Sequence, residues 1–156
     1  CIQPYTDVSV ELNVDALKEG DCAGLCLLQG CYGFIGVTKE LNRYYLVVVT
    51  RDLDENSMAE VLPDYMPGTL QEKILLETTV VNLRIKADFD DMVDTAQFYY
   101  KKNGEYVQVG GKHNLYYKVD HFTGCRVGLF NYATREIGGH AEFNRFRYRM
   151  SAAGKA

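Results

Sequence analysis

The chain has 156 residues, enough for one domain with a sizeable buried core. It is 47% hydrophobic and 24% charged with a formal net charge of −4, which excludes a strongly basic surface for nucleic acid. No apolar run approaches the roughly 18 residues of a membrane span and no segment resembles a signal peptide, so no membrane partner is expected either.

Short β-strands account for most of the hydrophobic pattern. Alternating or continuous apolar runs rich in Val, Ile, Tyr and Phe predict strands at Val8–Val14, Cys22–Gln29, Tyr32–Thr38, Arg43–Arg51, Lys73–Glu77, Val80–Lys86, Ala96–Lys101 and Tyr106–Val109. A further short edge strand is expected near Met58–Leu62. Tight reversals are expected at Glu40–Asn42 and at Asn103-Gly104. Val14–Lys18 is long enough for one helical turn at most.

The C-terminal segment Phe122–Arg149 predicts two strands joined by a hairpin. Its turn, Thr134–Gly139, is polar and ends in Gly-Gly, which supplies positive φ where the chain reverses. The apolar residues of the returning strand, Phe143 and then Phe146, are three positions apart. Because this step breaks the period of two, we expect a β-bulge near Asn144 and Arg145.

These elements predict an all-β fold, an antiparallel two-sheet sandwich of about eleven short strands. One domain over residues 1–150 is expected, followed by a disordered tail at 151–156. The sequence opens at Cys1 without Met, so we expect it to be excised from a longer protein.

Five cysteines, Cys1, Cys22, Cys26, Cys31 and Cys125, leave an odd count. Zinc sites prefer tighter paired spacing with His nearby, and Cys26 lies inside an apolar run, so buried structural thiols are favoured over a metal site. The unpaired set favours a reducing compartment, and we expect the cytoplasm.

The densest carboxylate cluster runs from Asp88 to Asp94. Asp88, Asp90 and Asp91 are weak candidates for Ca²⁺ ligands, because that ion requires six to eight oxygens. The segment lacks the Gly and the terminal Glu of a helical Ca²⁺ loop, so a solvated turn is favoured. No cofactor is expected.

Catalysis within this chain is not expected, because no spacing brings two carboxylates together across a cleft. Its tyrosines occur in adjacent pairs, and neighbouring residues of a strand point to opposite faces. Tyr45, Tyr99 and Tyr117 represent the outward set. They fit a sugar-binding platform, cross-strand pairs that stabilise a sheet, or a surface on which another domain docks.

Several segments in order resemble the C-terminal sandwich of glycoside hydrolase family 43 enzymes, the β-xylosidase and α-arabinofuranosidase group. They are Ala23-Gly24-Leu25, Tyr32–Lys39, Leu83-Arg84-Ile85, Phe98-Tyr99-Tyr100, Phe122-Thr123-Gly124, Val127-Gly128-Leu129 and Ala141–Tyr148. They cover residues 5 to 149, and the FTG…VGL…AEFNRFRY ending contributes most of the resemblance.

The resemblance implies a concanavalin-like β-sandwich that follows a catalytic five-bladed β-propeller in the same polypeptide. The propeller of such enzymes holds the catalytic carboxylates. The phenylalanine of the FTG segment, here Phe122, is expected to lean over the propeller's substrate pocket with its neighbour His121. The expected substrates are xylo- or arabino-oligosaccharides.

The chain departs from the family pattern in having no propeller and in its longer, more acidic Asp88–Asp94 turn. Hydrolysis is therefore not assigned to this chain. The alternative is an autonomous carbohydrate-binding module that uses the exposed tyrosines.

Overall fold

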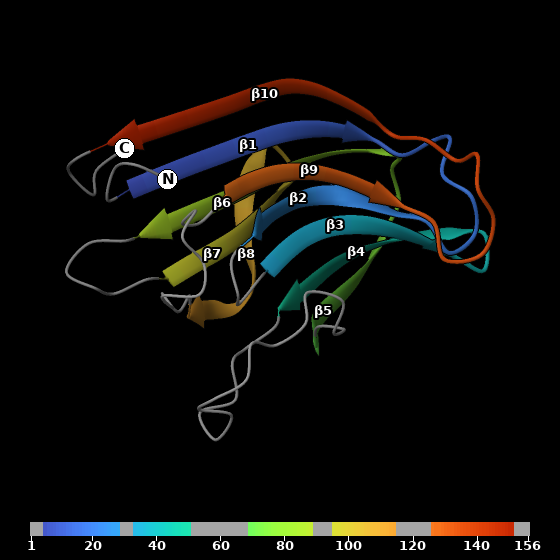
Figure 1. Cartoon of the computed structure of the whole chain (residues 1–156), viewed down its shortest axis with the longest axis horizontal. Coiled ribbons are helices and arrows are strands. Elements are labelled where there is room, and N and C mark those ends of the chain that lie inside the picture. Colours follow the sequence, from blue (N-terminus) through green and yellow to red (C-terminus); the bar gives the residue numbers. More distant parts are fainter. Residues whose placement is uncertain (1–4, 29–32, 51–68, 89–94, 115–125, 152–156) are drawn as a thin grey trace.

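A computed structural model describes residues 5–28, 33–50, 69–88, 95–114 and 126–151, which form ten β-strands (Figure 1). In chain order the strands are β1 (Tyr5–Asn13), β2 (Cys22–Leu28), β3 (Gly33–Glu40), β4 (Arg43–Thr50), β5 (Thr69–Leu76), β6 (Val80–Asp88), β7 (Thr95–Lys102), β8 (Glu105–Asn114), β9 (Arg126–Tyr132) and β10 (Glu142–Ser151). These ranges contain no α-helix, and so no helix in them could span a membrane. The strand expected near Met58–Leu62 lies outside the described residues.

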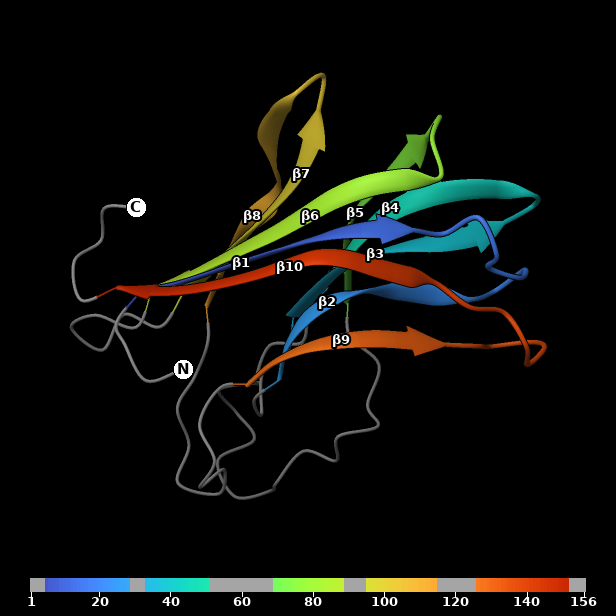
Figure 2. The ribbon, with the colours of Figure 1, turned by 90° about the horizontal axis from the view of Figure 1, so that it is seen from above.

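The ten strands make two antiparallel sheets that pack face to face (Figure 2). Sheet A has the order β10-β1-β6-β7-β8, and sheet B has the order β5-β4-β3-β2-β9. Strands β5 and β8 contact each other at one side of the sandwich, and the edge strands β9 and β10 lie at the other side (Figure 1). The predicted all-β two-sheet sandwich is confirmed.

The predicted C-terminal hairpin is wrong, because β9 and β10 belong to different sheets. Strand β9 pairs with β2, and β10 pairs with β1. Residues 133–141 cross between the sheets and bind the connection that follows β1. Thr134 Oγ1 donates to the carbonyl of Gly20 at 2.8 Å, and Lys18 Nζ donates to the carbonyl of Ile137 at 3.1 Å. Gly138 has the expected positive φ of 107°, so the glycine pair serves a crossover instead of a hairpin.

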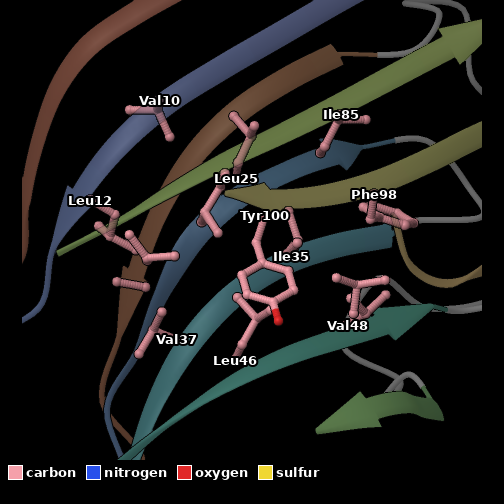
Figure 3. Close-up of a cluster of buried hydrophobic side chains, with 14 of the residues drawn as sticks. Val10, Leu12, Leu25, Ile35, Val37, Leu46, Val48, Ile85, Phe98 and Tyr100 are labelled. Atoms are coloured by element: carbon pink, nitrogen blue, oxygen red, sulfur yellow. The ribbon is translucent and has the colours of Figure 1, made fainter. Parts of the chain in front are cut away.

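Period-two alternation fills the space between the sheets with apolar side chains. In β1, Val8, Val10 and Leu12 are buried between partly exposed polar neighbours. Strands β6 and β7 repeat this pattern as predicted, and sheet B contributes the facing apolar residues Leu25, Ile35, Val37, Leu46 and Val48. Figure 3 shows side chains of both sheets meeting in this core. Burial of this apolar surface is the main stabilising term of the fold.

Residues with positive φ, in the left-handed region of backbone conformation, form the predicted tight turns. Leu41 and Asn42 have φ of 49° and 60°, and Asn103 and Gly104 have φ of 51° and 84°. Positive φ at both central residues matches the twist of the strands that a two-residue turn joins.

The predicted β-bulge near Asn144 and Arg145 is confirmed. The register between β1 and β10 shifts there, since Ser9 pairs with Arg147 whereas Glu11 pairs with Asn144. Arg145 has a φ of 52°. The extra residue restores the parity that places Tyr148 opposite the inward-facing Val8.

The sandwich has two ends of different character. At one end, β1 begins, β10 ends, and every segment outside the described ranges joins a strand. The described residues flanking the internal segments are Leu28, Gly33, Thr50, Thr69, Asp88, Thr95, Asn114 and Arg126. We call this the long-connection end. The opposite end, the turn end, holds the connections 14–21, 41–42, 77–79, 103–104 and 133–141.

Candidate functional site

The long-connection end is where the predicted pocket residues are attached. His121 and Phe122 lie outside the described residues, between Asn114 at the end of β8 and Arg126 at the start of β9. Strand β8 is an edge of sheet A on the β5 side, and β9 is the opposite edge of sheet B. The two attachment points therefore lie at the same end of the sandwich but at opposite sides of it.

The described tyrosines of the outward set do not share a surface. Tyr45 is on the outer face of sheet B, where Lys73 Nζ lies 4.6 Å from its ring centroid. Tyr99 is on the outer face of sheet A, where Lys86 Nζ lies 5.6 Å from its ring centroid. Their partners Tyr44 and Tyr100 pack into the core as the alternation requires. Because Tyr45 and Tyr99 lie on the outer faces of different sheets, one platform cannot include both. Tyr117 lies outside the described residues.

An ion pair organises the outer face of sheet A. The Arg84 guanidinium donates two hydrogen bonds to the Asp7 carboxylate, one of them from Nε to Oδ1 at 2.8 Å. These bonds raise the pKa of Arg84, and burial raises the pKa of the nearby Tyr99. A hollow of about 140 Å³ adjoins this pair, lined also by Ser9, Tyr106, Arg147 and Arg149. The bidentate geometry links β1 to β6 and fixes the side chains there.

The outer face of sheet B gathers aromatic residues that the sequence did not single out. Phe34, Phe130 and Tyr132 come from β3 and β9, which are separated in the sheet by β2. Gly24 and Gly36 face each other beneath Phe130 on β2 and β3. The outward-facing glycines were the available sequence signal, because a row of residues without side chains leaves room for a ring.

The candidate Ca²⁺ ligands are only partly described. Asp88 ends β6 at the long-connection end, whereas Asp90 and Asp91 lie outside the described residues. Within the described part of the chain, no three His, Cys, Asp or Glu residues are close enough to hold a metal ion.

The described cysteines, Cys22 and Cys26, are buried free thiols on the outer face of β2. Cys26 Sγ donates to the carbonyl of Gly128 at 3.4 Å. Burial raises the pKa of the Cys22 thiol to about 12 and that of Cys26 to about 11, from an ordinary value of 9.0. This agrees with the prediction that Cys26 acts as a small buried hydrophobe.

We expect Cys22 and Cys26 to resist alkylation by iodoacetamide in the folded chain. The thiolate is the reactive form, and a raised pKa keeps the thiol protonated until the pH nears that value. At pH 9 the folded chain holds a much smaller fraction of Cys26 as thiolate than the chain unfolded in urea does. Cys26 should therefore be labelled roughly 50-fold more slowly in the folded chain, and Cys22 more slowly still. Mass spectrometry with fragmentation locates the label. Labelling at the same rate in both states would contradict the burial of these thiols.

Known proteins share both the sequence family and the two-sheet fold of this chain. The model of the β-xylosidase C-terminal concanavalin A-like domain matches residues 2–149. The chain belongs to this family. The resemblance of the ordered sequence segments to the GH43 sandwich is thereby confirmed. A search of curated protein sequences gives no match.

Solved structures similar to this concanavalin A-like domain are much longer chains. A bifunctional GH43-CE protein from Bacteroides eggerthii has a TM-score of 0.81 and 33% identity over 96% of this chain. A GH43 glycoside hydrolase engineered for endo-xylanase and exo-arabinofuranosidase activity has a TM-score of 0.81 and 27% identity over 95%. A xylan β-1,4-xylosidase from Bacillus halodurans, at 18% identity over 94% and a TM-score of 0.70, shares the fold. The chain spans 18%, 30% and 28% of their respective lengths.

Proposed function

We propose that this concanavalin A-like domain is a non-catalytic accessory domain of a GH43 β-xylosidase or α-arabinofuranosidase. In this proposal it packs on a catalytic β-propeller that precedes it in the same polypeptide and helps to close the substrate pocket. The observation that carries the proposal is family membership over nearly the whole chain, combined with solved relatives of which the chain spans less than a third.

The long-connection end supports this role. Tyr5, the first described residue, lies at this end, and so do the attachment points of the segment that contains His121 and Phe122. A propeller joined through the start of β1 would therefore lie at the end of the sandwich where that segment is attached. An apolar ring placed at the mouth of the pocket would act by excluding water and positioning the sugar, without transferring a proton.

The β9–β10 side supports the packing part of the proposal. Leu129 on β9 and Phe146, Tyr148 and Met150 on β10 are large apolar residues that remain exposed. Leu129 pairs with Leu25, and Tyr148 pairs with Val8, so both point toward the space between the sheets at its uncovered side. A neighbouring domain would bury this strip, and Tyr, Phe and Met are enriched in such interface cores.

Phe122→Ala in the full-length enzyme is expected to lower kcat/KM for a short aryl xyloside or arabinoside by about tenfold to a hundredfold. Loss of a buried phenylalanine contact with substrate corresponds to about 1.5–3 kcal/mol of binding. Initial rates give kcat and KM separately, and thermal unfolding tests whether the fold is retained.

The matched control is Leu41→Ala, because Leu41 is 87% exposed at the turn end, away from the proposed pocket. Its kinetics should equal those of the unchanged enzyme. Normal kinetics for Phe122→Ala would reject the proposed role of this residue.

A further inference from the structure

The outer face of sheet B carries a groove that the proposed pocket does not use. A hollow of about 360 Å³ crosses this face from the end of β9 to β5. Cys22, Thr38 and Val47, from β2, β3 and β4, line it between Tyr132 at one side and Lys73 at the other. We call this hollow the outer groove.

Aromatic rings form one wall of the outer groove. The ring centroids of Phe34 and Phe130 lie 4.8 Å apart at 64°, and those of Phe130 and Tyr132 lie 5.8 Å apart at 22°. A Cβ on Gly36 would come 3.1 Å from Cζ of Phe130, so the glycine lets this ring lie close to the sheet. Phe34 and Tyr132 line the groove, and Tyr132 is 46% exposed. The rings thus support one another and present apolar surface to the hollow.

Hydrogen-bonding groups of both kinds form the rim. Lys73 Nζ and Glu40 Oε2 lie 2.5 Å apart as an ion pair at the β5 side. Arg135 lines the β9 side, and no ion pair of its guanidinium occurs among the described residues. The adjacent Thr134 is held by its hydrogen bond to the Gly20 carbonyl. The groove therefore offers donors and an acceptor around an apolar wall.

The size and chemistry of the outer groove fit a small polar ligand with an apolar face. Ligand pockets enclose about 300–1,000 Å³, whereas a stable protein partner needs roughly 800 Å² of surface. A pyranose or furanose ring combines hydroxyls with a face of C–H groups, so it matches the rings and the rim together. Because Lys73 is paired to Glu40, Arg135 is the remaining charged group of the rim, and its N–H groups can donate to the hydroxyls of a neutral sugar.

We propose that the outer groove binds a neutral oligosaccharide, with Tyr132 as the principal stacking residue. The choice of a xylo- or arabino-oligosaccharide rests on the proposed function. Tyr45 lies on the same face, three strands from Tyr132 and therefore about 14 Å away, which extends the surface along a longer chain. The groove is separate from the attachment points of the Phe122 segment, since Tyr132 is at the turn end of β9.

Calorimetric titration of the chain with xylohexaose and arabinohexaose tests this proposal. At least one sugar should bind, and Tyr132→Ala should weaken that binding by about tenfold or more, through loss of the stacked ring. Arg135→Gln is a second variant that leaves the strands untouched, and it should also weaken binding. The matched control is Tyr99→Ala, a tyrosine on the outer face of the other sheet, which should leave the affinity unchanged.

The outcomes separate the outer groove from the proposed accessory role. The proposal that the outer groove binds a sugar would be overturned if neither sugar bound, or if Tyr99→Ala weakened binding as much as Tyr132→Ala. A Tyr132→Ala variant that lowers the melting temperature of the full-length enzyme only would also overturn it, because the groove would then be a domain interface. In full-length enzyme, Tyr132→Ala should preserve kcat/KM for the short aryl glycoside on which Phe122→Ala acts. If neither sugar bound but Phe122→Ala lowered kcat/KM, sugar binding in the outer groove would be rejected while the proposed accessory role would still hold.

Discussion

Phe98→Ala is expected to lower the free energy of unfolding by about 3–5 kcal/mol. Phe98 has 0% exposure and is the largest fully buried side chain of the described core. It lies on β7 and packs into the space between the sheets (Figure 3). Removing the ring loses its burial and leaves a cavity that both sheets would have to move to fill. Since the free energy of unfolding of such domains is about 5–15 kcal/mol, this loss would be a large part of the stability of the domain.

Urea unfolding followed by circular dichroism measures this change for Phe98→Ala. The matched control is Phe146→Ala, the same substitution on β10 of the same sheet, where the ring is 49% exposed. Its cost in the isolated chain should stay below about 1.5 kcal/mol, because less surface returns to water. Equal costs for the two variants would contradict the position of Phe98 in the core.

Strand positions and faces were predictable because the side-chain period of a strand is a local property. Ala96, Phe98 and Tyr100 alternate with polar residues in the sequence, and burial in the structure follows this alternation. The bulge was predictable for the same reason, since the step from Phe143 to Phe146 breaks the period. Pairing partners are not local. Neighbouring strands in sequence usually pair, and β9 and β10 are an exception that turn composition could not indicate.

The candidate sites could not be predicted from local periodicity either, because they depend on connections and on which strands are neighbours. The role assigned to Phe122 came from resemblance to a family, since periodicity says nothing about a residue in a connection. The outer groove requires the strand order of sheet B, which places Phe34 of β3 against Phe130 of β9 across β2. A Cβ at Gly36 would lie 2.6 Å from the carbonyl oxygen of Ala23, so the absence of a side chain there lets β2 and β3 approach closely.

Gly24→Ala is expected to destabilise the domain by about 3 kcal/mol, at the upper end of the cost of overpacking. A Cβ at this position would lie 2.3 Å from the carbonyl oxygen of Ile35 and 2.5 Å from Cα of Gly36. Both atoms belong to the backbone of β3, so no side-chain rotation can relieve the overlap. Strands β2 and β3 would have to separate in the middle of sheet B, and the hydrogen bonds between them would weaken.

The matched control for Gly24→Ala is Gly104→Ala in the β7–β8 turn. A Cβ at Gly104 meets nothing within 4 Å, but the φ of 84° is unfavourable for alanine. Its expected cost is about 1–2 kcal/mol, from the backbone conformation alone. Urea unfolding of both variants therefore separates steric overlap from backbone strain. If Gly24→Ala cost less than Gly104→Ala, the close approach of β2 and β3 would be contradicted. The support that Gly24 and Gly36 provide beneath Phe130 in the outer groove would then be contradicted as well.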